Sequence, residues 1–130
     1  MAKKKILLID DNRNIVTMLS NRLRLNEYEV VTAYDGEEGL EKVLKETPDL
    51  IIVDVIMPKM DGYTFVKHVK ANQSINHIPI IVLTSKDKIK DLLQTEGVRG
   101  YIIKPCRSED LLEVVSKCLK EQESQTQKDP

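Results

Sequence analysis

Three aspartates stand directly after apolar runs, where their carboxylates could do chemistry together. Asp10 and Asp11 follow the run Lys5–Ile9, and Asp54 follows the run Leu50–Val53. Three carboxylates gathered in one place repel one another and raise one another's pKa unless a cation lies between them. Oxygen ligands of this kind suit Mg²⁺ or Mn²⁺ rather than zinc, and protein-bound Mg²⁺ commonly contacts phosphate oxygens. The aspartates therefore predict a site for Mg²⁺ or Mn²⁺ at which phosphate oxygens can bind.

Two further side chains follow apolar runs later in the chain. Thr84 ends the run Ile80–Leu83 and offers a hydroxyl donor, and Lys104 follows Tyr101–Ile103 and offers a cation. Lys104 can pair with Asp54 at rest and with a phosphoryl oxygen afterwards. Taken singly, each residue has a plainer interpretation: an aspartate can cap the next helix, a threonine can merely end a strand, and a lysine can be a solvated surface group. The combination of the three aspartates with a threonine and a lysine favours a functional site.

The elements that must position these side chains are strands alternating with helices. Four of the five apolar runs lack polar alternation, as strands buried on both faces do. The runs are Lys5–Ile9, Tyr28–Ala33, Leu50–Val53, Ile80–Leu83 and Tyr101–Ile103. Apolar residues at helical spacing lie between and after them, namely Ile15, Met18, Leu19 and Leu23; Leu40, Val43 and Leu44; Phe65, Val66 and Val69; Ile89, Leu92 and Leu93; and Leu111, Leu112, Val114, Val115, Cys118 and Leu119.

This alternation predicts an α/β fold, a three-layer α/β/α sandwich of five βα units with right-handed crossovers. We expect a five-stranded parallel sheet of order 2-1-3-4-5, in which the first and third strands are neighbours. In such sheets the binding crevice lies beyond the carboxyl ends of the strands. The three aspartates, the threonine and the lysine should therefore meet at one edge.

Size and composition exclude several classes of protein. A chain of 130 residues suits one domain, and a formal net charge of −1 indicates neither a nucleic-acid surface nor a membrane surface. No apolar run approaches the roughly 20 residues that cross a bilayer. The short apolar stretch after the basic start meets Asp10 at once, which is not typical of a signal peptide. We expect a cytoplasmic protein in which Cys106 and Cys118 are reduced structural thiols.

In order and spacing, these residues resemble the receiver domain of bacterial two-component response regulators, and the chain is similar to single-domain, chemotaxis-type members. The matching residues are Asp10-Asp11, the stretch Asp54–Gly62, Thr84-Ser85 and Lys104-Pro105. The match extends from about Lys3 to about Glu121. The resemblance implies a flavodoxin-like fold, with a receiver domain over residues 1–123. The composition of residues 124–130, which are mostly Ser, Gln, Thr and Lys, predicts a polar, disordered tail.

The resemblance also implies a role for each acid. Asp54 occupies the position of the phosphoacceptor. Asp11 corresponds to a direct metal ligand, and Asp10 corresponds to a ligand that usually acts through water. The backbone carbonyl of Ile56 matches a further metal ligand, so that the implied Mg²⁺ site consists of Asp10, Asp11, Asp54 and Ile56, with Mn²⁺ as a possible substitute.

The resemblance implies roles in switching for residues of the last two expected strands. Thr84 matches the switch hydroxyl that bonds the phosphoryl group, and Lys104 matches the lysine that bonds the phosphate. Tyr101 occupies the place of an aromatic side chain that rotates inward when the threonine moves. The Lys104–Pro105 bond falls where the family has a cis peptide.

The function implied is a phosphorylation-activated switch. A sensor histidine kinase or a phosphotransfer protein would donate a phosphoryl group to Asp54 in a Mg²⁺-dependent reaction. The face formed by the fourth helix, fifth strand and fifth helix would then change and control a downstream protein. We expect no direct binding of nucleic acid or membrane, and either a monomer or a dimer linked to phosphorylation.

Three alternatives remain beside this interpretation. The chain can be a receiver segment of a larger multidomain regulator or hybrid kinase. It can be an aspartyl-phosphate phosphatase, but such enzymes often carry a second aspartate two residues after the nucleophile, where this chain has Ile56. It can also be a pseudo-receiver that is never phosphorylated, although the complete set of acids, threonine and lysine opposes this. We therefore expect a signalling protein rather than an enzyme, with only slow self-dephosphorylation.

The chain departs from the family pattern at a few positions. Cys106 replaces a frequent phenylalanine, and Ser85 replaces a common alanine. The stretch from Ser85 to Ile103 is slightly short, which puts the geometry of the fourth helix in doubt. Ile56 and Lys86 flank the expected acceptor, and Ile56 has no group that could orient water. Slow hydrolysis of the phosphoryl group is the resulting hypothesis.

Overall fold

The computed structural model of the chain describes residues 3–57, 59–85 and 97–128, apart from the side chains of residues 125–128. Within these residues the chain forms five strands and four helices. They are β1 (Lys5–Ile9), α1 (Arg13–Leu25), β2 (Glu29–Ala33), α2 (Gly36–Glu46), β3 (Leu50–Asp54), α3 (Gly62–Ala71), β4 (Ile80–Thr84), β5 (Val98–Ile103) and α5 (Ser108–Lys128). The helix predicted at Ile89, Leu92 and Leu93 lies outside the described residues.

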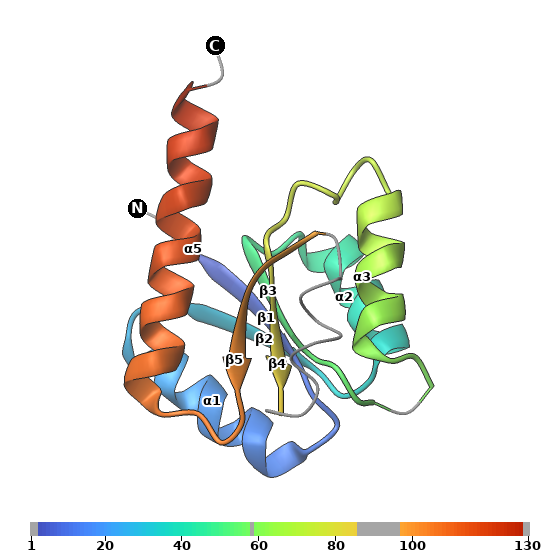
Figure 1. Cartoon of the computed structure of the whole chain (residues 1–130), viewed down its shortest axis with the longest axis vertical. Helices are drawn as coiled ribbons and strands as arrows, with labels where there is room; N and C mark the ends of the chain where they lie inside the picture. The colour runs from blue at the N-terminus through green and yellow to red at the C-terminus, as the bar shows by residue number, and fades with distance from the viewer. Residues whose placement is uncertain (1–2, 58, 86–96, 129–130) are drawn as a thin grey trace.

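The strands form one parallel sheet in the order β2-β1-β3-β4-β5, which confirms the predicted topology. Helices α1 and α5 cover one face, and α2 and α3 cover the other, so that the domain has three layers (Figure 1). The register pairs Ile9 with Val53, Asp54 with Leu83, and Thr84 with Ile103. The carboxyl ends of the four strands β1, β3, β4 and β5 therefore reach the same edge of the sheet.

Burial on both faces explains the unbroken apolar runs. On β1, Leu7 and Ile9 pack into the cluster under α2 and α3, whereas Ile6 and Leu8 pack into the cluster under α1 and α5. The apolar residues of β1 thus fill two apolar layers in alternation, as the sequence pattern predicted. Strand β2 is the edge strand next to β1, and its first residue, Glu29, is exposed. Its position at the edge accounts for its more polar sequence.

Helix α5 is longer than we expected. We expected a polar, disordered tail over residues 124–130, but α5 continues to Lys128 and extends past the body of the domain (Figure 1). Lysine, glutamate and glutamine are good helix formers, and no glycine or proline interrupts the sequence before Pro130. A polar composition does not by itself prevent a helix.

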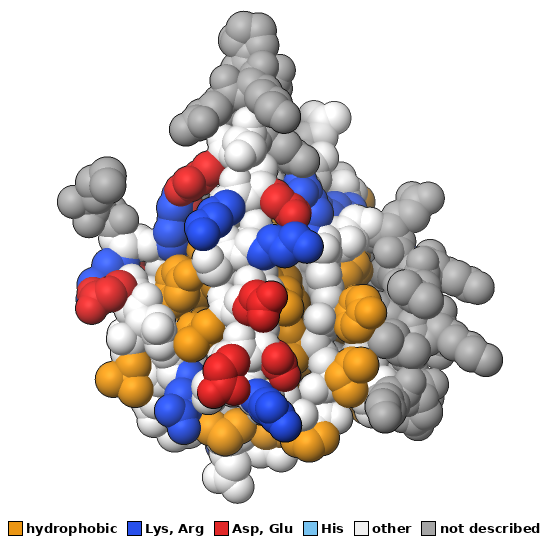
Figure 2. All heavy atoms as spheres, turned by 60° about the vertical axis from the view of Figure 1, so that its left-hand side comes forward, with side chains coloured by type: hydrophobic (Ala, Val, Ile, Leu, Met, Phe, Trp, Pro, Cys, Tyr) orange, Lys and Arg blue, Asp and Glu red, His pale blue; other side chains and the backbone are white. Residues whose placement is uncertain are grey.

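The outer side of α5 carries charges of both signs. Figure 2 shows lysines, aspartates and glutamates down the middle of this face, with apolar side chains on either side. The exposed charged residues are Glu109, Asp110, Glu113, Lys117, Lys120, Glu121 and Glu123. Leu111 and Val115 lie on the opposite, buried side of the helix. Among the residues described, no helix is long and apolar enough to cross a membrane.

The basic start of the chain is neutralised by ion pairs. Each of its lysines pairs with a glutamate from a different part of the fold. The pairs are Lys3–Glu27 at 3.6 Å, Lys4–Glu123 at 3.6 Å and Lys5–Glu46 at 3.2 Å. These contacts tie the start of β1 to the turn after α1, to α5 and to α2, so the lysines do not form an unpaired cationic patch.

Candidate functional site

The three predicted aspartates meet at the carboxyl edge of the sheet. Asp10 follows β1, and Asp54 ends the neighbouring β3, one position beyond the paired residues Ile9 and Val53. One carboxylate oxygen from each of Asp10, Asp11 and Asp54 lies within 4.8 Å of the others. Asp10 and Asp54 are buried, whereas Asp11 is exposed. This set of oxygen ligands, open to solvent on one side, fits a hydrated Mg²⁺ ion.

The plainer interpretation of these acids as helix caps does not hold. The N-cap of α1 is Asn12, whose side chain accepts hydrogen bonds from two amides of the first turn. The N-cap of α3 is Asp61, while Asp54 belongs to β3 itself. Asp10 accepts a hydrogen bond of 3.0 Å from the Asn12 amide, which orients its carboxylate. The cluster of Asp10, Asp11 and Asp54 therefore has no capping role that would explain it.

Lys104 provides the cation of the site. Its Nζ donates to Asp10 Oδ2 at 2.8 Å and lies 3.3 Å from Asp54 Oδ2. Its backbone amide donates to the Thr84 carbonyl at 2.7 Å, which joins the ends of β4 and β5. The Lys104–Pro105 peptide is cis, as the resemblance implied. The structure thus contains the expected pairing with Asp54, and it adds a shorter contact with Asp10 that sequence reasoning missed.

The electrostatics of the cluster favour a bound cation. Burial, and next the charge of Asp10, raise the pKa of Asp54 to about 6, despite Lys104 and a hydrogen bond from the Ile56 amide. Burial lowers the pKa of Lys104, but its hydrogen bond with Asp10 and the two carboxylate charges outweigh this, and the net shift is upward. One lysine does not compensate all of the negative charge. A divalent cation among the acids would favour ionised Asp54.

Thr84 and Tyr101 lie on the adjacent strands β4 and β5. Thr84 is buried at the end of β4, and its hydroxyl donates to the Ser85 carbonyl at 3.2 Å. Tyr101 is paired with Val82 across the sheet, and 42% of its surface is exposed. The predicted threonine is therefore at the correct edge, with its hydroxyl bonded to backbone, and the predicted aromatic residue faces solvent.

The segment after β3 folds back tightly on the strand end. The Gly62 amide donates to the Val55 carbonyl at 2.8 Å. A Cβ on Gly62 would meet the Asp54 carbonyl and would lie 2.8 Å from Val55 Cα, so only glycine fits there. This return places the Ile56 amide on the Asp54 carboxylate and leaves the Ile56 side chain 61% exposed. An aspartate-glycine pair before a helical pattern was the available sequence signal for this turn.

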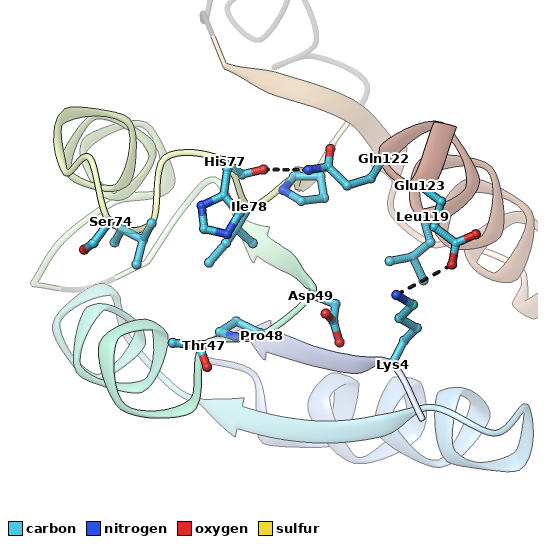
Figure 3. A pocket seen from close by; sticks show the side chains of 12 residues that line it. Lys4, Thr47, Pro48, Asp49, Ser74, His77, Ile78, Leu119, Gln122 and Glu123 are labelled. Atoms are coloured by element: carbon cyan, nitrogen blue, oxygen red, sulfur yellow. Dashed lines mark hydrogen bonds and ion pairs between the residues drawn. The ribbon is translucent and has the colours of Figure 1, made fainter. Parts of the chain in front are cut away.

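A cavity of about 530 Å³ lies at the opposite, amino-terminal edge of the sheet (Figure 3). It opens between residues 47–49, residues 74–79 and residues 119–123 of α5. Polar groups around it pair with one another: Gln122 Nε2 donates to the His77 carbonyl at 3.1 Å, and Lys4 lies 3.6 Å from Glu123. Because the aspartates lie at the other edge, this cavity is separate from the candidate site. His77 borders this cavity.

Comparison with known proteins agrees with this fold. Residues 6–116 match the response regulator receiver domain family, and the chain belongs to that family. It is 44% identical over 104 residues to the alkaline phosphatase synthesis transcriptional regulatory protein PhoP of Bacillus subtilis, covering 78% of this chain and 42% of that protein. The chain spans about half the length of most of the curated relatives that it matches.

Solved structures give the same result. The chemotaxis response regulator CheY4 of Vibrio cholerae is 36% identical with a TM-score of 0.83, covering 89% of this chain and 98% of that one. The receiver domain of the sensor histidine kinase PA1611 of Pseudomonas aeruginosa, which has a magnesium ion coordinated in its active site cleft, is 27% identical with a TM-score of 0.84, covering 92% and 99%. The chain is therefore a two-component receiver domain, a phosphorylation-controlled signalling switch.

Proposed function

We propose that Asp54 accepts the phosphoryl group in this switch. The observation that carries the proposal is the meeting of three carboxylates and one ammonium group at a single strand edge. The donor would be the phosphohistidine of a sensor histidine kinase or of a phosphotransfer protein. No other cluster of at least three possible metal-ligating side chains is found within the described part of the chain.

The metal ligands in this proposal are the carboxylates of Asp10, Asp11 and Asp54 and the backbone carbonyl of Ile56. The proximity of the three carboxylate oxygens supports Mg²⁺, with Mn²⁺ as a substitute, because these ions prefer oxygen ligands. A bound divalent cation would offset the charge that gathers on phosphoryl oxygens during transfer. The raised pKa of Asp54 supports the same assignment, since the isolated cluster holds more negative charge than Lys104 balances.

Transfer then requires mainly alignment. A carboxylate oxygen of Asp54 attacks phosphorus, the phosphorus–nitrogen bond of the phosphohistidine breaks, and its electron pair remains on the imidazole nitrogen. Lys104 already lies 3.3 Å from Asp54, so its ammonium group can bond a phosphoryl oxygen with little movement. The Ile56 amide, which now donates to the Asp54 carboxylate, can donate to the product instead.

The switch follows from a change of hydrogen-bond partners. A phosphoryl group adds strong acceptor oxygens and up to about two negative charges. The Thr84 hydroxyl can leave the Ser85 carbonyl for this stronger acceptor. Movement of Thr84 frees space into which Tyr101 can turn from its exposed position on β5. The face of β5 and α5, together with the expected helix at residues 89–93, would then present a different surface to a downstream protein.

The acyl phosphate should persist because Ile56, the described residue that flanks it, cannot prepare a water molecule. Ile56 is exposed next to Asp54 and carries no group that could orient or deprotonate water. Lys86, the other flanking residue, lies outside the described residues. Asp54 is also not followed by an acid two positions later, which opposes turnover as a phosphatase. We propose slow self-dephosphorylation and no action on external substrates.

The proposed setting is the cytoplasm, with protein partners and no direct contact with nucleic acid or membrane. The receiver can act alone, as a monomer or a phosphorylation-linked dimer, or within a longer protein. Among its relatives are transcriptional regulators about twice its length and a hybrid signal transduction histidine kinase of Dictyostelium discoideum, of which the match covers 7%. These relatives support a receiver within a longer protein as strongly as the chemotaxis regulators support a receiver that acts alone.

One experiment tests the proposal. The protein is incubated with Mg²⁺ and phosphoramidate, a small donor with the phosphorus–nitrogen bond of phosphohistidine, and its intact mass is measured. We expect one base-labile phosphoryl group in the wild type and in Asp49→Asn, a control at the opposite sheet edge, and none in Asp54→Asn. An adduct that survives Asp54→Asn, or a wild type that takes none from any donor, would overturn the proposal. Rapid hydrolysis of an external phosphate ester would favour a phosphatase.

A further inference from the structure

The described residues after β3, 55–57 and 59–61, include Ile56 and contact two other parts of the fold. Near Asp54, the Val55 amide donates to the Leu83 carbonyl at 3.1 Å, and the Gly62 amide returns to Val55. Further along the chain, Lys59 Nζ lies 3.6 Å from Asp35 Oδ2. Asp35 belongs to a distant part of the sequence and is the N-cap of α2, the helix that packs beside α3. The segment that presents the Ile56 amide and carbonyl is thus linked to the first turn of α2.

Asp35 is a fixed partner in this link. Its Oδ1 accepts a hydrogen bond of 2.8 Å from the Glu38 amide, and Glu38 Oε1 accepts one of 2.6 Å from the Tyr34 amide. This reciprocal capping leaves Asp35 Oδ2 for Lys59. The hydrogen bond from Glu38, together with the charge of Lys59, holds the pKa of Asp35 below its usual value. Asp35 is therefore a rigid and fully ionised anchor at neutral pH.

The backbones also touch at this point. A Cβ on Gly36 would lie 2.7 Å from both the Cβ and the carbonyl oxygen of Met60, so the start of α2 packs directly on the segment. Lys59 has φ 68°, a left-handed conformation that glycine or asparagine adopts more easily. The backbone alone does not favour lysine here. The charge that lysine offers to Asp35 gives a reason for its presence.

We propose that Lys59 is a positioning residue for phosphoryl transfer. Paired with Asp35, it holds the segment after β3 so that the Ile56 amide stays on the Asp54 carboxylate and the Ile56 carbonyl, a metal ligand in the proposed function, keeps its position. This inference rests on the proposed function and deepens it. Lys59 itself, with 61% of its side chain exposed, contacts no reacting atom in this account.

A positioning role and a simple effect of charge make opposite predictions for Mg²⁺ binding by the variant Lys59→Met. If Lys59 acted only through its charge, Lys59→Met would tighten Mg²⁺ binding and Asp35→Asn would weaken it. If the pair positions the segment, both substitutions weaken Mg²⁺ binding, by about two- to fivefold for an exposed pair. Asparagine retains the acceptor for the Glu38 amide, so the cap of α2 is preserved.

The measurements are the Mg²⁺ dissociation constant by calorimetry, the phosphorylation rate at saturating Mg²⁺, and the melting temperature. Lys3→Met is the matched control, because it removes an exposed ion pair of the same 3.6 Å length at the opposite edge. We expect Lys59→Arg to bind Mg²⁺ like the wild type, and the double variant Lys59→Met/Asp35→Asn to be no worse than either single one.

Opposite shifts in the two single variants, or wild-type Mg²⁺ binding in Lys59→Met, would overturn the positioning role. A purely structural role would lower the melting temperature more than Lys3→Met does but leave the Mg²⁺ affinity of the folded protein unchanged, and this result would also overturn the positioning role. Failure of the proposed function is distinguishable, since the wild type itself would then accept no phosphoryl group. If the wild type is phosphorylated normally and the Lys59 variants have wild-type Mg²⁺ affinity and phosphorylation rate, the positioning role is contradicted and the proposed function stands.

Discussion

The ammonium group of Lys104 is bonded more closely to Asp10 than to Asp54, with Nζ distances of 2.8 Å and 3.3 Å. Asp10 is fully buried, so this contact neutralises a carboxylate that has little access to water. Phosphorylation of Asp54 would bring phosphoryl oxygens toward Lys104, and a metal ion would engage Asp10. The lysine must therefore exchange one partner for another when the receiver changes state.

Replacing this lysine separates its role in transfer from metal binding. Lys104→Met should slow phosphorylation by about 10- to 100-fold, the effect of losing one hydrogen bond to a charged group. Mg²⁺ should bind at least as tightly as to the wild type, because a competing cation is gone. Rates with phosphoramidate and calorimetric titration check both parts, with Lys67→Met on α3 as an exposed control. Weaker Mg²⁺ binding in Lys104→Met would contradict the partner exchange.

The raised pKa of Asp54 predicts a dependence of stability on pH. Because the folded pKa, about 6, exceeds the usual value of 3.8, the folded state binds this proton more tightly than the unfolded state does. The contribution of Asp54 to stability is therefore greatest at pH values below about 4 and falls as pH rises through 6. Each unit of difference between the folded and unfolded pKa corresponds to about 1.4 kcal/mol in the free energy of unfolding.

Asp54→Asn tests this linkage. Without Mg²⁺ at pH 7 the variant should have a higher free energy of unfolding than the wild type, by about 1–3 kcal/mol. The difference should shrink at pH 5 and when Mg²⁺ is added to the wild type. Urea unfolding at the two pH values measures it. If Asp54→Asn is more stable than the wild type by the same free energy of unfolding at both pH values, the ionisation of Asp54 is not the cause.

The close approach of Gly62 to the backbone of Asp54 and Val55 predicts that alanine is tolerated less well at Gly62 than at Gly100. Gly62→Ala should lower the free energy of unfolding by about 1–3 kcal/mol and weaken phosphorylation, because the new Cβ meets the Asp54 carbonyl and Val55. Gly100→Ala on β5 is the control, since its Cβ would lie 3.4 Å from the nearest atom, Val114 Cγ1. Equal tolerance of both substitutions in thermal unfolding would contradict the close approach.

A buried hydroxyl on α1 offers a stabilising substitution. Ser20 is 2% exposed, and its Oγ has no hydrogen-bond partner among the residues that the structure describes. Ser20→Ala should raise the free energy of unfolding by about 1 kcal/mol, by removing an unsatisfied polar group and improving helix propensity. Ser116→Ala on α5, which is only half-buried, should gain less. Destabilisation by Ser20→Ala would show that the hydroxyl is satisfied.

The lifetime of the phosphoryl group should depend on Ile56. Ile56→Asn places an amide able to orient water beside the acyl phosphate, and we expect the half-life to fall severalfold. Ile56→Val is the control, because it keeps an apolar side chain. The decay of the phosphorylated species, followed by intact mass after removal of the donor, measures the effect. Equal half-lives in the two variants would contradict control by this side chain.

The sequence was sufficient to predict which residues meet, because parallel strands end at the same edge. Asp10 and Asp54 each follow a buried run, and Thr84 and Lys104 do the same on later strands, so topology alone brings them together. The sequence was not sufficient to predict that Lys104 prefers Asp10. That preference depends on a difference of 0.5 Å between two contacts, which is set by side-chain packing.

Two other features depended on information that patterns do not contain. The contact between Lys59 and Asp35 joins loops whose relative position follows from the packing of α2 on α3. The helical course of residues 124–128 reflects helix propensity in a segment whose polarity suggested disorder. In both cases the residue types were visible, but the geometry that gives them a role came from the whole fold.

The central claim is that Asp54, and no neighbouring acid, carries the phosphoryl group. The protein is phosphorylated with phosphoramidate and Mg²⁺ and then reduced with borohydride, which converts an aspartyl phosphate into homoserine, and the modified peptide is sequenced by mass spectrometry. We predict homoserine at position 54 only, and none when Mg²⁺ is removed by chelation. Homoserine at position 10 or 11, or equal modification without Mg²⁺, would contradict the account.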